Sequence, residues 1–165
     1  MTHFAADRMR RTLLSGVMVG IGVVGTLDEV VLHQLLDWHH FVDLTVYAGA
    51  PLDERTRSVG LVADGLFHIV STLLLGWGML RLRSDFRTPW EGWQRRFWAG
   101  FCLGFGGFNL YDAVIQHKVL RLHEVRRGVD NLLPYDLVFG GIAASVLVLG
   151  VVLLRTVRPS PQRAP

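Results

Sequence analysis

Carboxylates and histidines recur at a fixed spacing in two stretches of an otherwise apolar chain. The first stretch carries Asp28, His33 and His39, and the second carries Asp112, His117 and His123. Both read D-x4-H-x5-H, and the copies lie 84 positions apart. Imidazole nitrogens and carboxylate oxygens are ligands of Zn, Fe, Mn and Cu. The repeated pattern therefore predicts a transition-metal site that holds one or two ions.

Two carboxylate–imidazole pairs also have helical spacing. Glu29 and His33 are four residues apart, as are Asp64 and His68, so each pair shares one face of an α-helix. Asp28 and His33 are five residues apart, which is about 140° around an ideal helix. Unless a bulge or a partner helix intervenes, those two side chains do not face one point. The sequence leaves open whether Asp28 or Glu29 is the ligand.

The predicted metal ligands are acids and histidines expected at one depth in their helices: Asp28, Glu29, His33, Asp64, His68, Asp112 and His117. Additional ligands, or groups that hydrogen-bond to ligands, are expected nearer the helix ends: His39, His123, Tyr135 and Asp136. If a metal-bound water does chemistry, Asp136 or Tyr135 would exchange its proton. His40 is expected to be an ordinary surface residue. Redox chemistry, hydrolysis and non-catalytic metal handling all remain open.

Four apolar segments must position these groups: 12–38, 60–80, 97–120 and 137–154. Half of all residues are hydrophobic and 19% are charged, against about a quarter charged in soluble domains. The last segment has 18 residues without a charge, which is long enough to cross a bilayer. A soluble bundle would need polar outer faces that these helices lack. The expected fold is an all-α bundle of four transmembrane helices over residues 12–155.

The two polar stretches belong to a longer internal repeat. Residues 16–39 and 100–123 share eight identities in 24 positions, including three glycines. The chain is therefore expected to contain two parallel helical hairpins, repeat one over 12–81 and repeat two over 97–155. Each repeat has a G-x3-G motif in its first helix. Such motifs let helices approach closely in lipid.

The basic residues predict how the chain lies in the membrane. Eleven Lys and Arg residues fall on the side of the two termini and six on the other. The positive-inside rule puts the N-terminal segment 1–11 and a disordered tail, 156–165, in the cytoplasm. The acids and histidines then lie in the outer half of a bacterial inner-membrane protein. The pI near 9.6 does not indicate nucleic-acid binding, because the basic residues stand at the ends of apolar runs.

Three other functions fit the same residues. Haem could take axial ligands from His33, His68 or His117, although several neighbouring acids suit a porphyrin poorly. A buried chain of Asp and His could relay protons or ions, although the inner half is rich in Gly, Val and Leu. The same groups could also simply tie the helices together around a watery cleft.

Four stretches resemble a known bacterial family: "LDEVVLHQLLDWHH", "DGLFH", "FNLYDAVIQHKVLRLHEVR" and "PYDLVF". The family consists of small four-span membrane proteins catalogued as a domain of unknown function, and the resemblance covers about residues 12–155. It implies an integral inner-membrane protein and carries no reaction with it. Members occur beside respiratory-oxidase assembly proteins, which implies an assembly role without catalysis as an alternative. The expected partners are the lipid bilayer and a second copy of the chain or a respiratory complex.

Overall fold

The computed structural model describes residues 3–156, and every regular element in that range is helical. The α-helices are α1 (His3–Asp28), the short α2 (Leu44–Tyr47), α3 (Glu54–Arg87), α4 (Trp93–Tyr111) and α5 (Leu133–Thr156). Two π-helical segments, η1 (Glu29–Leu35) and η2 (Asp112–Val119), directly continue α1 and α4. The all-α prediction is confirmed for the described residues.

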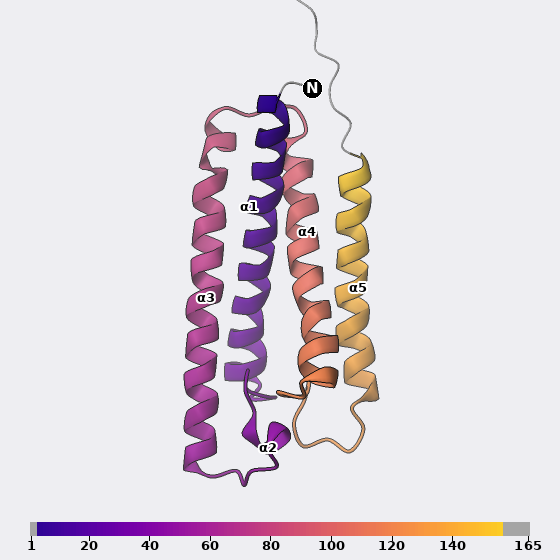
Figure 1. Ribbon diagram of the computed structural model, residues 1–165. Helices are drawn as coiled ribbons and strands as arrows, with labels where there is room; N and C mark the ends of the chain where they lie inside the picture. Colours follow the sequence, from indigo (N-terminus) through magenta and orange to yellow (C-terminus); the bar gives the residue numbers. More distant parts are fainter. Residues whose placement is uncertain (1–2, 157–165) are drawn as a thin grey trace, which may run out of the picture.

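The four long helices lie side by side (Figure 1). Helix α1 packs against α3 and α4, and α4 also packs against α5, so α1 and α4 form the centre. The first turn of α1 and the last turn of α5 lie at one end of the molecule. The segments η1, η2 and α2 and the loops beside them gather at the other end, which we call the polar end.

Three helices are long and apolar enough to cross a membrane: Phe4–Leu35, Glu54–Arg87 and Leu133–Thr156. In the most apolar part of α3 and of α5, only 17% and 11% of the residues are buried against protein. Their apolar side chains therefore point outward, as expected for helices surrounded by lipid. Helix α4, Trp93–Tyr111, is not among the three candidates. The fourth predicted span stays a prediction.

Two helices are longer than their apolar runs. Helix α1 already begins at His3, so residues 3–11 are its first turns. Helix α3 begins at Glu54 because Asp53 caps it: the Asp53 carboxylate accepts from the Thr56 N–H at 2.8 Å, and the Thr56 hydroxyl accepts from the Asp53 N–H at 3.0 Å. This reciprocal capping box satisfies backbone groups that the helix itself leaves free. Of the predicted tail, residues 157–165 lie outside the described range.

Glycines bring the two central helices into backbone contact. A Cβ atom on Gly16 would collide with the carbonyl oxygen of Phe97, and one on Gly100 would collide with that of Leu13. The next glycine of each G-x3-G motif makes the same exchange one turn further along. Only glycine permits this approach, which gives α1 and α4 extensive dispersion contacts and fixes their relative position.

A buried carboxylate ties α1 to α3 at the end opposite the polar end. Asp85 is fully buried, and its Oδ2 accepts a hydrogen bond from the Thr12 hydroxyl at 2.7 Å. Its Oδ1 lies 3.3 Å from the Arg11 guanidinium and 3.2 Å from the Trp90 indole nitrogen. These partners satisfy the charge that burial would otherwise make costly. The register between α1 and α3 is thereby fixed far from the polar end.

Candidate metal centre

The first D-x4-H-x5-H pattern folds into one ligand group, which we call the first triad: Asp28, His33 and His39. Asp28 ends α1, His33 lies in η1, and His39 lies in the loop that follows. One ligand atom from each residue lies within 4.8 Å of the others. Nε2 of His33 is 3.3 Å from Oδ2 of Asp28. Two imidazoles and a carboxylate form the donor set of many iron sites, and of zinc sites that use Glu as the carboxylate.

The π-helical turn removes the apparent conflict between Asp28 and His33. The N–H of Leu36 donates to the carbonyl of Val31 at 3.0 Å, five residues back instead of four. This wider turn brings residues five apart onto one face of the helix. Asp28 and His33 can therefore face the same point, which an ideal α-helix would not allow.

The second pattern folds in the same way into the second triad: Asp112, His117 and His123. All three residues are buried, and their ligand atoms lie within 4.8 Å of one another. Oδ2 of Asp112 is 3.0 Å from Nε2 of His117, and its Oδ1 is 3.4 Å from Nε2 of His123. The N–H of Leu120 donates to the carbonyl of Ile115 at 2.7 Å, again five residues back. Both triads are thus built on a π-helical turn.

Backbone carbonyls orient one histidine of each triad. Nδ1 of His39 lies 2.9 Å from the carbonyl oxygen of Val125, and Nδ1 of His123 lies 2.9 Å from that of Phe41. Because a carbonyl can only accept, we assign the ring hydrogen to Nδ1 in both cases, which leaves Nε2 with a lone pair. Metal-binding histidines commonly donate their other ring N–H in this way. Burial lowers the pKa of His39 well below its ordinary value, so this ring is neutral and able to bind a metal.

Three of the four ring nitrogens that face the triads lack hydrogen bonds in the described chain. Within the described chain, Nε2 of His33, His39 and His117 is buried without a hydrogen-bond partner. Nε2 of His33 and His117 lies near a carboxylate oxygen, yet neither makes a hydrogen bond to it. Leaving a buried polar atom unpaired costs about 1–3 kcal/mol. A cation bound between the nitrogens and the carboxylates would satisfy all of them.

The two triads are neighbours. The rings of His39 and His123 stack with their centroids 4.7 Å apart. His33 lies 4.6 Å from His39, and His117 lies 4.7 Å from His123, measured between ring centroids. Four imidazoles therefore form a continuous cluster between η1 and η2. Ions held by the two triads would lie close to each other.

Reciprocal hydrogen bonds join the loops that follow η1 and η2. The N–H of Asp43 donates to the carbonyl of Leu122 at 2.9 Å, and the N–H of Arg127 donates to the carbonyl of Trp38 at 2.7 Å. The two donor residues, Asp43 and Arg127, are 84 positions apart, and so are the two acceptor residues, Trp38 and Leu122. The loops therefore hold His39 and His123 in matching positions.

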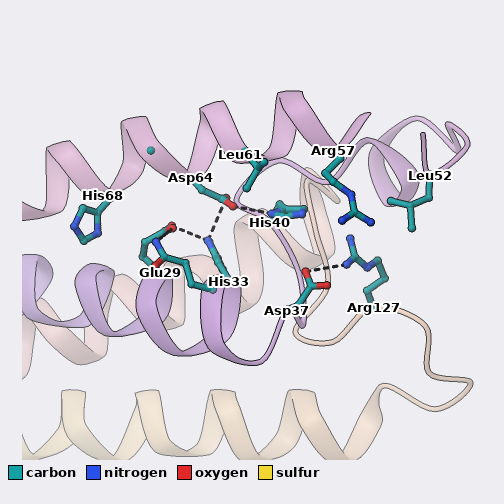
Figure 2. Close-up of a pocket in the computed structure, with 12 residues that line it drawn as sticks. Glu29, His33, Asp37, His40, Leu52, Arg57, Leu61, Asp64, His68 and Arg127 are labelled. Carbon is teal, nitrogen blue, oxygen red and sulfur yellow. Dashed lines mark hydrogen bonds and ion pairs between the residues drawn. The ribbon is translucent and has the colours of Figure 1, made fainter. Parts of the chain in front are cut away.

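A third group, which we call the pocket group, lies on the other side of the His33 ring: Glu29, His33 and Asp64. Nδ1 of His33 is 2.8 Å from Oε2 of Glu29 and 3.2 Å from Oδ1 of Asp64, which comes from α3 (Figure 2). The other oxygen of Asp64 is 2.7 Å from Nδ1 of His40. These three residues also have ligand atoms within 4.8 Å of one another. Asp28 and Glu29 thus both face His33, at opposite ring nitrogens.

The pocket group borders a pocket of about 580 Å³. Figure 2 shows His68 beyond Glu29 at one end of the pocket, and Arg57 and Arg127 at the other end. Gly65 of α3 also lines it. A small ligand or ion in this pocket would therefore meet the carboxylates of the pocket group directly.

Three predicted site residues lie outside the ligand groups. His68 lines the pocket, and its Nδ1 is buried without a hydrogen-bond partner in the described chain. Tyr135 accepts a hydrogen bond from Arg126 at 2.7 Å, and Asp136 pairs with Lys118 at 2.5 Å. Tyr135 and Asp136 thus contact the basic side chains of Arg126 and Lys118, and the structure does not bring them to the triads.

Sequence reasoning missed the positions of the loop histidines. His40 was expected at the surface, and this is wrong, because it is buried against Asp64. His39 and His123 were expected to be additional ligands or partners of ligands, and each belongs to a triad. The only signal in the sequence was that His39 and His123 are equivalent in the repeat, since loop residues have no helical periodicity.

The fold and the site define an all-helical membrane protein that gathers histidines and carboxylates at one end of its helices. Over residues 15–157 the chain matches the family described as "Predicted membrane protein (DUF2243)", and it belongs to that family. This finding confirms the resemblance seen in the sequence motifs. The chain matches no curated protein and no solved structure.

Proposed function

We propose that the chain is a membrane protein that holds two transition-metal ions, one in each triad. One observation carries the proposal: buried Nε2 atoms without hydrogen bonds face a carboxylate in both triads. The opposite nitrogens of His39 and His123 are fixed by backbone carbonyls, as is usual for metal ligands. The donor set, two imidazoles and one carboxylate, suits Fe, Zn, Mn or Cu. It leaves coordination positions open for redox or hydrolytic chemistry, or for transfer of the metal.

An internal duplication supports the presence of two equivalent sites. In this proposal, residues 12–81 and 97–155 are two hairpins, and α4 is the fourth span. The N–H of Leu36 and the N–H of Leu120 make equivalent π-turn bonds. Asp37 and Arg121, 84 positions apart, both adopt left-handed backbone angles, with φ of 48° and 51°. Such angles are uncommon for residues other than glycine, so their recurrence at one repeat position favours a shared design.

The proposed location is the bacterial inner membrane, with both termini in the cytoplasm and both triads near the outer face. The start of α1 and the end of α5 lie at the same end of the molecule, opposite the polar end (Figure 1). Arg8, Arg11 and Arg95 belong to the first turns of α1 and α4 at that end. The positive-inside rule would keep this arginine-rich end in the cytoplasm.

Haem is less well supported by the packing. An axially bound porphyrin needs space beside the imidazole of its ligand. The His39 and His123 rings stack on each other, and each also makes an edge contact with one further triad histidine, His33 or His117. Metal ions need no such space, so bare ions agree better with these contacts.

Metal analysis of the purified full-length protein tests the proposal. Protein in detergent is dialysed against Fe(II), Mn(II), Zn(II) or Cu(II), and bound metal is measured by inductively coupled plasma mass spectrometry. We expect two ions per chain, one ion after His39→Ala or His123→Ala, and none after both changes. His68→Ala is the control and should keep two ions, because His68 belongs to neither triad. A wild-type chain that binds none of these metals would refute the proposal.

A further inference from the structure

The geometry points to the pocket group as an entry site through which a divalent cation reaches the first triad, an inference that rests on the proposed function. The pocket is lined by Glu29, His33 and Asp64 but not by Asp28 or His39. His33 is the residue that the pocket group and the first triad share. A cation arriving through the pocket therefore meets the pocket group first, and His33 lies between the two positions.

The donors of the pocket group suit a transient cation. Glu29 and Asp64 are 1% and 4% exposed, so their carboxylates are little screened by solvent. Only one imidazole nitrogen, Nδ1 of His33, accompanies them, whereas the first triad offers two imidazole nitrogens. Transition metals of the Zn, Cu and Fe type bind imidazole more strongly than carboxylate alone. The larger number of imidazole donors in the first triad therefore favours movement of the cation from the pocket group to the first triad.

The charges around the pocket agree with cation entry. Arg127 at one end of the pocket is paired with Asp37 at 3.1 Å and with Asp43 at 3.3 Å, which offsets its charge. Arg57 is exposed, so solvent screens it. In the part of the pocket away from these arginines, the acids are Glu29 and Asp64, whose described partners are Gln34 and the imidazoles of His33 and His40. Carboxylates in a cleft attract cations and raise their association rate, by about ten- to a thousandfold where a single sign of charge lines the cleft.

Among the described residues, the second triad has no counterpart of the Glu29 carboxylate. Ala113 occupies the position that corresponds to Glu29 in the repeat. Nδ1 of His117 is buried without a hydrogen-bond partner in the described chain, and its ring lies 5.6 Å from that of Phe139. In the described chain, no carboxylate partners Nδ1 of His117, whereas two carboxylates face Nδ1 of His33. The two triads should take up metal at different rates, with the first triad faster.

Stopped-flow uptake of Co(II) by the metal-free, full-length protein tests this inference. The d–d absorbance of Co(II) reports ligand binding, and the final metal content is measured on the same samples. We expect two kinetic phases, a fast phase for uptake by the first triad and a slow phase for the second. In the double variant Glu29→Gln and Asp64→Asn, the fast phase should be at least tenfold slower, and the final metal content should stay the same. The wild-type fast phase should slow as salt rises, and the double variant should lose this salt dependence. Asp136→Asn removes an acid that lies outside the pocket and should leave both phases unchanged.

Filling the pocket provides a second test that leaves all donors intact. A Cβ atom on Gly65 would meet nothing within 4 Å, so Gly65→Phe can place its ring in the pocket without a backbone clash. It should slow the fast phase and keep the final content. Gly140→Phe is the matched control, because Gly140 is equally open and does not line the pocket.

Three results would overturn the inference. The first is an unchanged fast phase in the double variant or in Gly65→Phe. The second is loss of one ion at equilibrium in the double variant, because Glu29 and Asp64 would then be needed to hold the metal. The third is unchanged uptake with faster release, which would mean that Glu29 and Asp64 only orient the His33 ring. Residues that orient a metal ligand typically change metal affinity by about 10–100-fold. Failure of the proposed function itself would look different, since the wild-type chain would bind no metal.

Discussion

Replacing Gly104 by alanine tests the backbone contact between the two central helices. The added Cβ atom would collide with the carbonyl oxygen of Val17 in α1, and it would also lie 2.9 Å from the Val17 Cα. Because both obstacles are backbone atoms, no side-chain rotation can relieve them, and the helices must move apart. Overpacking of this kind typically costs about 1–3 kcal/mol. We expect the free energy of unfolding in detergent micelles to fall by that amount.

Gly76→Ala is the matched control for this prediction. Gly76 lies within α3, and a Cβ atom there would meet nothing within 4 Å. Alanine is a better helix former than glycine by about 0.5–1 kcal/mol, so this variant should be as stable as the wild type or more stable. Both variants are unfolded by SDS titration and followed by tryptophan fluorescence. If Gly104→Ala were as stable as Gly76→Ala, the close packing of α1 on α4 would be refuted.

Three further outcomes follow from the structure. Asp85→Ala should lower the free energy of unfolding by about 1–3 kcal/mol, because the hydrogen bonds of the Asp85 carboxylate are lost. The metal content should stay unchanged, because Asp85 lies far from the triads. Loss of metal from this variant would contradict that separation. Cys102 is buried in α4, so a maleimide should label it only after unfolding, and rapid labelling of the folded protein would show that α4 packs differently. Removing metal with a chelator should lower the unfolding temperature, and adding metal back should restore it, because a ligand of the folded state stabilises that state; equal unfolding temperatures with and without metal would count against binding.

Much of the helical framework could be predicted from the sequence because apolar length and charge are strong local signals. The run from Leu137 to Leu154 predicted a spanning helix, and α5 contains it. The ends of the helices were harder to predict. Helix α3 begins earlier than its apolar run because Asp53 and Thr56 form a capping box, which adds polar turns to the helix. The side-by-side order of the helices also depends on long-range glycine contacts that one sequence does not specify.

The site was predicted by residue type better than by geometry. The spacing of Asp28 and His33 looked wrong for one site because the prediction assumed an ideal α-helix. The π-helical turn has no clear signature in side chains, so only the recurrence of the D-x4-H spacing 84 positions later could have indicated it. His40 was missed because it reaches Asp64 through the tertiary packing of a loop. The spacing shared by the two stretches predicted the candidate ligands, and the fold determined which ring nitrogen of His33 each acid approaches.

An anomalous difference map of metal-loaded crystals tests directly whether each triad holds an ion. Crystals of the full-length protein loaded with Fe(II) or Zn(II) would give an anomalous difference map at the metal absorption edge. We expect two strong peaks, one beside Nε2 of His33 and His39, and one beside Nε2 of His117 and His123. A map without a peak at either triad, from protein loaded with each metal in turn, would contradict the two-ion proposal.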